Sequence, residues 1–226
     1  MNSKIFPWIL KGILILLICF FAIATVRSIM RPQKFKMIYD NRLALAKQRL
    51  ITIRTIQNVY RNEFKKYATS VDTLVDFIEH GMITIVSNQG FIPEGMGEEE
   101  ALKKGLIKRE MIKVTAKSKV LDQDSTLVLD NFQYVPLTNN KLKFVIKTAS
   151  IKGKNFEVPT YCITVSKEDL LRTMDRDIHG NSHNSLVRLW NKIIYSNLSE
   201  ETSEINKYKD VIMGSLTEAH TNGNWE

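Results

Sequence analysis

An unbroken apolar run opens the chain. From Phe6 to Val26, about 21 residues carry a single charge, Lys11. Because roughly 20 apolar residues in a helix cross a hydrocarbon core about 30 Å thick, this run predicts a transmembrane helix. We expect apolar, aromatic and headgroup-contacting side chains to hold it there. These anchor residues are Trp8, Lys11, Leu14, Phe20 and Phe21.

A cleaved signal peptide is the alternative for the same run. Lys4 would be its positive region, Gly12 to Phe21 its apolar stretch, and Ala22-Ile23-Ala24 its small-residue cleavage site. The apolar run extends past Lys11 toward the N-terminus and reaches spanning length. The sequence therefore favours a retained anchor over cleavage.

Beyond the anchor, apolar residues recur at spacings of three and four. Pro32 predicts a break or kink, with a second helix starting near Lys34. The repeating positions indicate a long amphipathic helix, and Gln57 interrupts them once. This apolar seam comprises Leu43, Leu50, Ile53, Tyr60 and Phe64. A face of this width more often packs on the protein's own sheet, and contact with a partner protein is the alternative.

Short elements follow the stem helix. Thr69 and Asp72 resemble a capping box that opens a helix over residues 71–80, and Gly81 is expected to close it in the left-handed conformation. Residues 82–86 then predict a short strand, residues 87–97 an exposed loop, and residues 98–104 one or two helical turns.

After Ile107 the apolar period changes to two, which is typical of strands. Turn-rich breaks of hairpin length separate these segments, so they predict an antiparallel sheet. The expected strands are 111–114, 132–135, 143–146, 161–165 and 211–213. Ser166 with Asp169 is expected to cap another helix, and residues 186–195 to form a further one with Trp190 in the core. The tail after Leu216 is expected to fray.

Together these patterns predict an α+β fold with a transmembrane helix, a long amphipathic stem helix and an antiparallel sheet. The expected boundaries are an anchor over 1–30, a helical stem over 31–69, an α+β domain over 70–216 and a tail over 217–226.

Charge concentrates in the stem. The net charge is +8, and from Arg27 to Lys66 there are 11 basic residues against two acidic ones. Attraction to anionic headgroups and a solvated helix face both explain this balance, and the interspersed apolar residues favour the solvated face. Nucleic-acid binding is not expected, since aromatic platforms and motif spacing are absent. The positive-inside rule places the domain in the cytoplasm, whereas an uncleaved signal-like helix places it in the periplasm.

No pattern of chemistry stands out. Asp175, Asp177, His179 and His183 are the one cluster of ligand-type residues, and Gly180 between the histidines favours a solvated loop over a zinc-binding helix. Glu98 to Glu100 fit a helix N-terminus better than acid catalysis. We therefore expect no catalytic, cofactor-binding or metal-binding residues and no bound cofactor.

The stretch from Leu43 to Gly81 is similar to the region after the membrane helix in type II secretion pseudopilins, through Ile53, Thr55-Ile56-Gln57, Tyr60 and Tyr67. This resemblance implies a pilin-like architecture in which the stem helix packs on an antiparallel sheet. The apolar run lacks the Gly-aromatic cleavage site and the early glutamate of prepilins, so the resemblance does not extend to pilin processing.

The chain as a whole looks closer to uncharacterised single-span proteins of Bacteroidota. The sequence segments that carry this resemblance are Ile29-Met30-Arg31-Pro32, Ala101 to Ile107, Tyr134-Val135-Pro136, Gly214 to Ala219 and Gly223 to Glu226. This resemblance carries no function with it.

The function that the sequence favours is a membrane-anchored, non-enzymatic assembly or scaffold component of a secretion- or pilus-like envelope complex. Its expected partners are the membrane, other envelope proteins and further copies of itself. We expect it in the inner membrane, crossing once, with the C-terminal domain in the periplasm. A membrane-tethered ligand-binding or sensory domain is the alternative, and an enzyme comes third.

Overall fold

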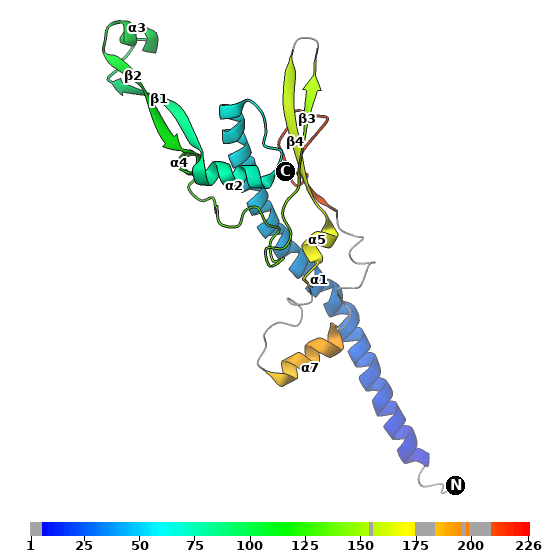
Figure 1. Cartoon of the computed structure of the whole chain (residues 1–226). Helices are drawn as coiled ribbons and strands as arrows, with labels where there is room; N and C mark the ends of the chain where they lie inside the picture. The colour runs from blue at the N-terminus through cyan, green and yellow to red at the C-terminus, as the bar shows by residue number, and fades with distance from the viewer. Residues whose placement is uncertain (1–5, 154–155, 175–183, 196–197, 199–208) are drawn as a thin grey trace. The chain divides into compact units, whose positions relative to one another are not determined.

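The computed structural model describes residues 6–153, 156–174, 184–195, 198 and 209–226 (Figure 1). It confirms the α+β class, with a long apolar N-terminal helix and antiparallel strands. The helices are α1 (Phe6–Phe64), α2 (Val71–His80), α3 (Glu98–Lys103), α4 (Ala116–Gln123), α5 (Lys167–Leu171) and α7 (Ser185–Ile194). The strands are β1 (Met82–Gly90), β2 (Ile107–Thr115), β3 (Ile146–Lys152), β4 (Glu157–Val165) and β5 (Val211–Gly214).

Helix α1 runs for 59 residues and contains Pro32. The predicted break at Pro32 and the new start at Lys34 are therefore wrong, and the alternative of a kink at Pro32 stays a prediction. Proline removes one backbone N–H and so one hydrogen bond, to the carbonyl four residues earlier. Long stretches of helix on both sides keep their own hydrogen bonds, and the helix continues through this local loss.

The first part of α1 is long and apolar enough to cross a membrane. Its most apolar stretch has a mean hydropathy of 2.7, and none of that stretch is buried within the protein. The anchor residues Trp8 and Phe20 are 76% and 67% exposed. A helix that is apolar on all sides and covered by no part of its own chain matches a membrane segment.

Contacts divide the chain into two compact units. The first comprises residues 1–46, 135–142 and 165–211, and the second comprises residues 47–134, 143–164 and 212–226. Each unit thus joins segments that are far apart in sequence. The boundaries predicted from the sequence follow the chain in order, and they stay predictions.

In the first unit, α1 buries Phe35, Ile38 and Tyr39. Arg42 is fully buried, and its guanidinium donates to the carbonyl oxygen of Leu170 over 2.6 Å and to the hydroxyl of Thr173 over 3.1 Å. Helix α5, which supplies Leu170, begins where Ser166 accepts a hydrogen bond from the Asp169 N–H. The predicted cap at Ser166 is confirmed.

In the second unit, α1 contributes a buried face. Leu50 and Ile53 are fully buried, Tyr60 is half-buried, and Phe64 is 47% exposed. The remaining seam residue, Leu43, belongs to the first unit and is half-buried there. The seam residues thus differ in burial, and a role in partner binding stays a prediction.

Gln57 is a buried polar residue on this apolar face, and its hydrogen bonds explain why it is stable there. Its side-chain amide donates to the Ala68 carbonyl over 3.0 Å, and its side-chain oxygen accepts from the Ala68 N–H over 2.9 Å. The helix ends at Phe64, and Lys65 takes a positive φ of 59°. Gln57 therefore fixes the return of the chain after the helix.

Helix α2 matches its predicted range, but its two ends differ from expectation. Ser70, one residue after the predicted Thr69, caps it by accepting from the Thr73 N–H over 3.1 Å. Gly81 has an extended conformation, with φ of −68°, and is not left-handed. Glycine is needed here for space, since a Cβ would lie 2.3 Å from the Phe77 carbonyl oxygen.

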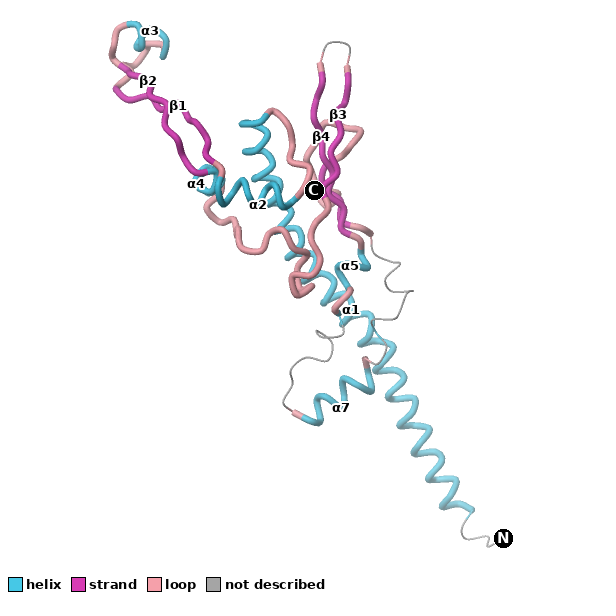
Figure 2. The backbone as a smooth tube through the Cα atoms, in the orientation of Figure 1, coloured by secondary structure: helices cyan, strands magenta, loops and turns pink. Residues whose placement is uncertain are grey.

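The strands form two antiparallel sheets. Among the described strands, β1 pairs only with β2, from Met82 opposite Thr115 to Gly90 opposite Ile107 (Figure 2). The other sheet has the order β3-β4-β5. Strand β1 therefore runs past the predicted end at residue 86 into the predicted loop.

Two predicted strands, 132–135 and 143–146, are wrong. They meet in a single bridge between Tyr134 and Lys143, and β3 begins only at Ile146. Positive φ angles between 54° and 60° at Asn131, Leu137, Asn139 and Asn140 turn the chain too sharply for a ladder. Helix α4, capped by Thr115, was not predicted.

The C-terminal residues and Trp190 also differ from prediction. The tail is attached, since Met213 bridges Gly223 and Arg54 pairs with Glu226 over 2.7 Å. Trp190 is 46% exposed and therefore not a core residue. An aromatic side chain at the centre of an apolar pattern does not reveal whether protein or another apolar medium covers it.

Candidate functional site

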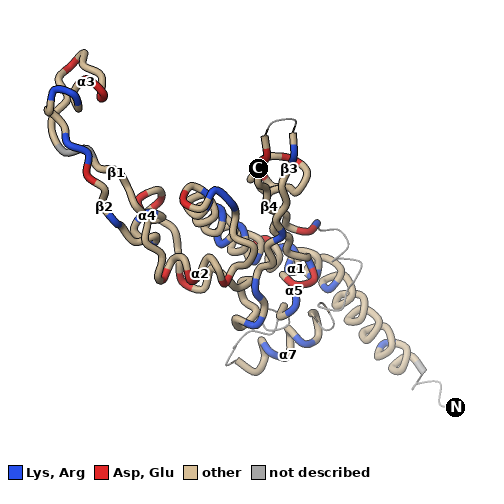
Figure 3. The backbone as a smooth tube through the Cα atoms, turned by 45° about the horizontal axis from the view of Figure 1, so that its top comes forward, with Lys and Arg blue, Asp and Glu red and all other residues tan. Residues whose placement is uncertain are grey.

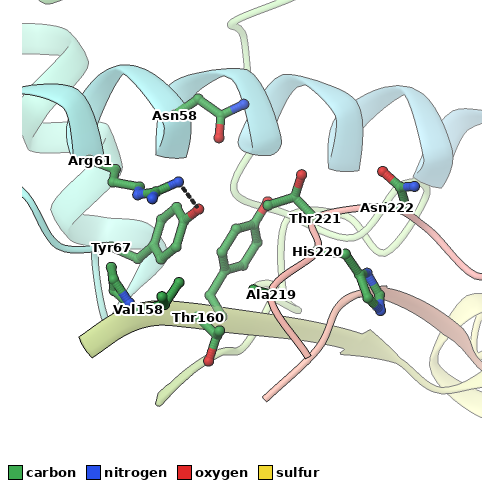
Figure 4. A pocket seen from close by; sticks show the side chains of 11 residues that line it. Asn58, Arg61, Tyr67, Val158, Thr160, Ala219, His220, Thr221 and Asn222 are labelled. Carbon is green, nitrogen blue, oxygen red and sulfur yellow. Dashed lines mark hydrogen bonds between the residues drawn. The ribbon is translucent and has the colours of Figure 1, made fainter. Parts of the chain in front are cut away.

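A cavity of about 450 Å³ lies within the second unit (Figure 4). Its walls come from the C-terminal end of α1, the chain after that helix, strand β4 and the last segment of the chain. The lining residues are Asn58, Arg61, Tyr67, Val158, Pro159, Thr160, Tyr161, Ala219, His220, Thr221 and Asn222. Its volume is within the range typical of small-molecule sites.

Strands β4 and β5 position the wall formed by residues 219–222. Gly214, at the end of β5, has a positive φ of 76°, and a Cβ there would lie 2.2 Å from the Tyr161 carbonyl oxygen. Its N–H donates to the Asn222 carbonyl over 2.9 Å. The close approach that glycine permits thus brings the C-terminal segment beside β4.

The side chains of Tyr67, Tyr161 and Arg61 form one side of the cavity. The rings of Tyr67 and Tyr161 meet edge to face, with centroids 4.6 Å apart. The Arg61 guanidinium extends from α1 and donates to the Tyr67 hydroxyl over 3.2 Å (Figure 4). This bond and the ring contact hold the three side chains in fixed positions.

The Tyr161 hydroxyl is the unusual group of this site. It is buried and has no hydrogen-bond partner among the described residues. Burial raises the pKa of Tyr161 well above its ordinary value of 10.0, so the phenol stays neutral. A buried neutral hydroxyl that donates no hydrogen bond destabilises the folded protein.

The chemistry of the lining favours ligands that accept hydrogen bonds. Arg61 brings a positive charge, Asn58, Asn222 and Thr221 bring neutral polar groups, and no lining residue is a carboxylate. His220, which lines the cavity, lies 3.3 Å from the carboxylate of Glu218, which is not a lining residue. Such a cavity can hold a small polar or anionic molecule.

The residues singled out by the sequence lie elsewhere. None of the anchor or seam residues lines the cavity. Asp175, Asp177, His179 and His183 fall outside the described residues, and among the described ones no group of three or more His, Cys, Asp and Glu could hold a metal. In the sequence, Tyr67 ends the apolar repeat of the stem and belongs to the pseudopilin-like stretch, and Tyr161 belongs to a predicted strand. Their pairing across about 90 residues had no local signal.

No protein-family model, curated protein or solved structure matches this chain.

Proposed function

We propose that this protein is a membrane-anchored, non-enzymatic assembly component of an envelope complex, of the secretion or pilus kind. In this proposal α1 holds the chain in the inner membrane and the folded units face the periplasm, where they bind other envelope proteins or further copies of the same chain. The exposed apolar start of α1 supports the anchoring. The edge of strand β1 supports the assembly role.

Strand β1 presents an unprotected edge. It pairs with β2 on one side, and no other described strand pairs with it. Its nine residues, MITIVSNQG, include no charge and no proline, whereas β2 carries Lys108, Arg109, Glu110 and Lys113 (Figure 3). Natural sheets usually block such edges with charges or proline, so an open edge favours the addition of a strand from another chain.

Exposed apolar side chains lie beside that edge. Val86 and Met111 face each other across the hairpin and are 59% and 79% exposed. Val86 and Met111 line a surface depression together with Arg109 and Glu98, which form an ion pair 3.2 Å long. An apolar centre next to charged groups is the composition of a protein interface. An isolated two-stranded hairpin is marginally stable, so a partner would also stabilise it.

The pilin-like arrangement belongs to this proposal. It is supported by the second unit, where Asn58 and Arg61 of α1 and residues 158–161 of β4 line one cavity. A helix that follows a membrane segment and faces an antiparallel sheet is the architecture that the pseudopilin resemblance implies. Fold-level analogy of this kind bears on architecture, and the assembly role rests on β1.

A lysine in β1 tests the assembly role. Thr84→Lys adds a charge to the open strand, and Thr148→Lys makes the same change at an exposed position of β3 as the control. Full-length protein is extracted from native membranes in mild detergent, and light scattering measures the mass of protein per particle. We expect the native chain and the control to exceed the 26.1 kDa of one chain, and Thr84→Lys to approach it.

A native particle of 26.1 kDa would contradict the assembly role. So would a Thr84→Lys particle as large as the native one. A separate measurement addresses orientation. Protease added to spheroplasts should degrade the folded units, and protection until lysis would place them in the cytoplasm.

The cavity supports a second candidate function, a membrane-tethered ligand-binding or sensory domain. The observation that favours it is the cavity of about 450 Å³, whose lining includes the Arg61 guanidinium and no carboxylate. A panel of small carboxylates and phosphates should then contain compounds that raise the melting temperature of the native protein. Arg61→Gln should lose this shift and Thr148→Lys should keep it. Equal shifts in both variants would exclude the cavity as the binding site.

A further inference from the structure

Helix α7 is strongly amphipathic and exposes its apolar side. Leu186, Leu189, Trp190 and Ile193 lie at positions i, i+3, i+4 and i+7, which share one face of a helix. They are 72%, 56%, 46% and 41% exposed. Burying them in an apolar medium would stabilise the protein, since the transfer of apolar surface out of water is favourable.

The opposite side of α7 is basic. Arg188 and Lys192 lie there with Asn191, and the helix contains no acidic residue. The C-terminal end of the helix is attached to its unit, since Ile194, its last residue, is fully buried and Tyr195, the residue after it, is 7% exposed. The exposed apolar face is thus presented by a helix with an attached end.

The same unit contains the membrane segment. Helix α7 and the first 46 residues belong to one compact unit. Phe35, the first fully buried residue of α1, follows Val26 by nine residues, which is about 13 Å of helix at ~1.5 Å per residue. Between them lie Arg27, Arg31 and Lys34, basic residues where anionic headgroups would be. The folded part of this unit therefore starts close to the bilayer surface.

We propose that α7 lies in the surface of an anionic membrane, with its apolar face among the acyl chains and Arg188 and Lys192 on the headgroups. A large amphipathic moment, a basic polar face and an apolar face with Trp and Leu are the features of interfacial helices. The inference rests on the anchoring by α1 that the proposed function includes. It adds a second membrane contact that is independent of any protein partner.

The three tryptophans allow a direct test in the full chain. Trp8 lies in the anchor and Trp190 in α7, while Trp225 belongs to the second unit, where the Lys47 ammonium lies 5.5 Å from its ring. Three variants each keep one tryptophan and replace the other two with phenylalanine. Each is reconstituted in vesicles of phosphatidylcholine and phosphatidylglycerol with brominated acyl chains, which quench nearby indoles.

We expect Trp190 to lose roughly half or more of its fluorescence, as an indole at the acyl boundary should. Trp8 should also be quenched, and Trp225 should be quenched much less. Quenching of Trp8 without quenching of Trp190 would overturn the inference while leaving the anchor intact. Quenching of Trp190 without Trp8 would uphold the inference and contradict the proposed anchor. Quenching of neither would overturn both.

A variant without the basic charges of α7 tests whether anionic lipid headgroups hold Trp190 at the membrane. Arg188→Gln with Lys192→Gln should lower Trp190 quenching in vesicles rich in phosphatidylglycerol and change it little in pure phosphatidylcholine. The control, Lys147→Gln with Lys152→Gln at exposed positions of β3, removes the same charge and should change neither. If the apolar face binds a protein instead, Trp190 stays unquenched in these vesicles, which contain lipid and this chain alone, and the inference fails.

Discussion

Two lengths of the same helix have opposite surroundings. Residues 7–23 of α1 are apolar on every side and exposed, with Ile15 at 61%. Residues 42–59 are also rich in apolar side chains, yet Ala46, Leu50, Ile53 and Ile56 are fully buried. Apolar content therefore does not distinguish a lipid-facing helix from a protein-facing one.

The polar residues of α1 distinguish its lipid-facing length from its protein-facing length. In the first length, Lys11 is the one charge, and it lies near the N-terminal end. In the second, Arg42 and Gln57 are fully buried and hydrogen-bonded to backbone carbonyls of other segments. A buried polar side chain with a specific partner requires a fixed protein environment, which fluid acyl chains cannot supply.

Truncating an isoleucine in each length should give the largest contrast. Ile53→Ala removes buried methyl groups and should lower the free energy of unfolding by roughly 2–5 kcal/mol. Ile15→Ala, the same change in the exposed length, should leave thermal unfolding of the folded part nearly unchanged. If Ile53→Ala instead leaves the melting transition intact but abolishes crosslinks to membrane neighbours, the seam binds a partner. If Ile53→Ala changes neither the melting transition nor the crosslinks, the seam contributes neither to the core nor to partner binding.

Gln57→Ala should have the next largest effect. It leaves the N–H and carbonyl of Ala68 buried without their partner, so we expect a loss of about 2 kcal/mol. Chemical denaturation measures this loss. Asn62→Ala, at an exposed position of the same helix, is the control. A loss no larger than that of the control would mean that other groups replace the Gln57 bonds.

Tyr161→Phe should act in the opposite direction. Removing an unpaired buried hydroxyl should raise the free energy of unfolding by about 1 kcal/mol. Because burial raises the folded-state pKa of Tyr161, stability is retained below the unfolded pKa of about 10 and falls as the pH rises above it, by up to ~1.4 kcal/mol per pH unit. The phenylalanine variant should lose this alkaline component. A destabilised variant at neutral pH would indicate that the hydroxyl is paired.

The smallest effect should come from Glu226→Gln. This change weakens the 2.7 Å ion pair with Arg54. The side chains of Arg54 and Glu226 are 24% and 31% exposed, so we expect the free energy of unfolding to fall by about 0.5 kcal/mol. Denaturation at ~1 M salt should reduce the difference, because screening shortens the range of charge interactions to about 3 Å. A loss that is independent of salt would assign the effect to packing.

The sequence predicted correctly the features that depend on neighbouring residues, and it failed where a structure depends on contacts between residues far apart in the chain. The apolar run, the helix over 71–80 and the cap at Ser166 each depend on residues within a few positions. The extent of β1 depends on its pairing with β2 about 20 residues away, and the polar text of residues 87–90 gave no sign of a strand.

The errors at residues 132–146 have a different origin. Alternating apolar residues suggested two strands there, but left-handed backbone at Asn131, Asn139 and Asn140 favours turns. The cavity was unpredictable for a further reason. Its walls come from residues 58–67, 158–161 and 219–222, which only the folded chain brings together.

Gly214 and Gly81 have a consequence for evolution. At each, a methyl group would lie within 2.3 Å of a carbonyl oxygen, that of Tyr161 or that of Phe77. A descendant of this chain could change most surface residues and still fold, whereas alanine at either position would displace backbone. We expect diverged relatives to keep both glycines, together with Gln57, after their overall similarity has faded.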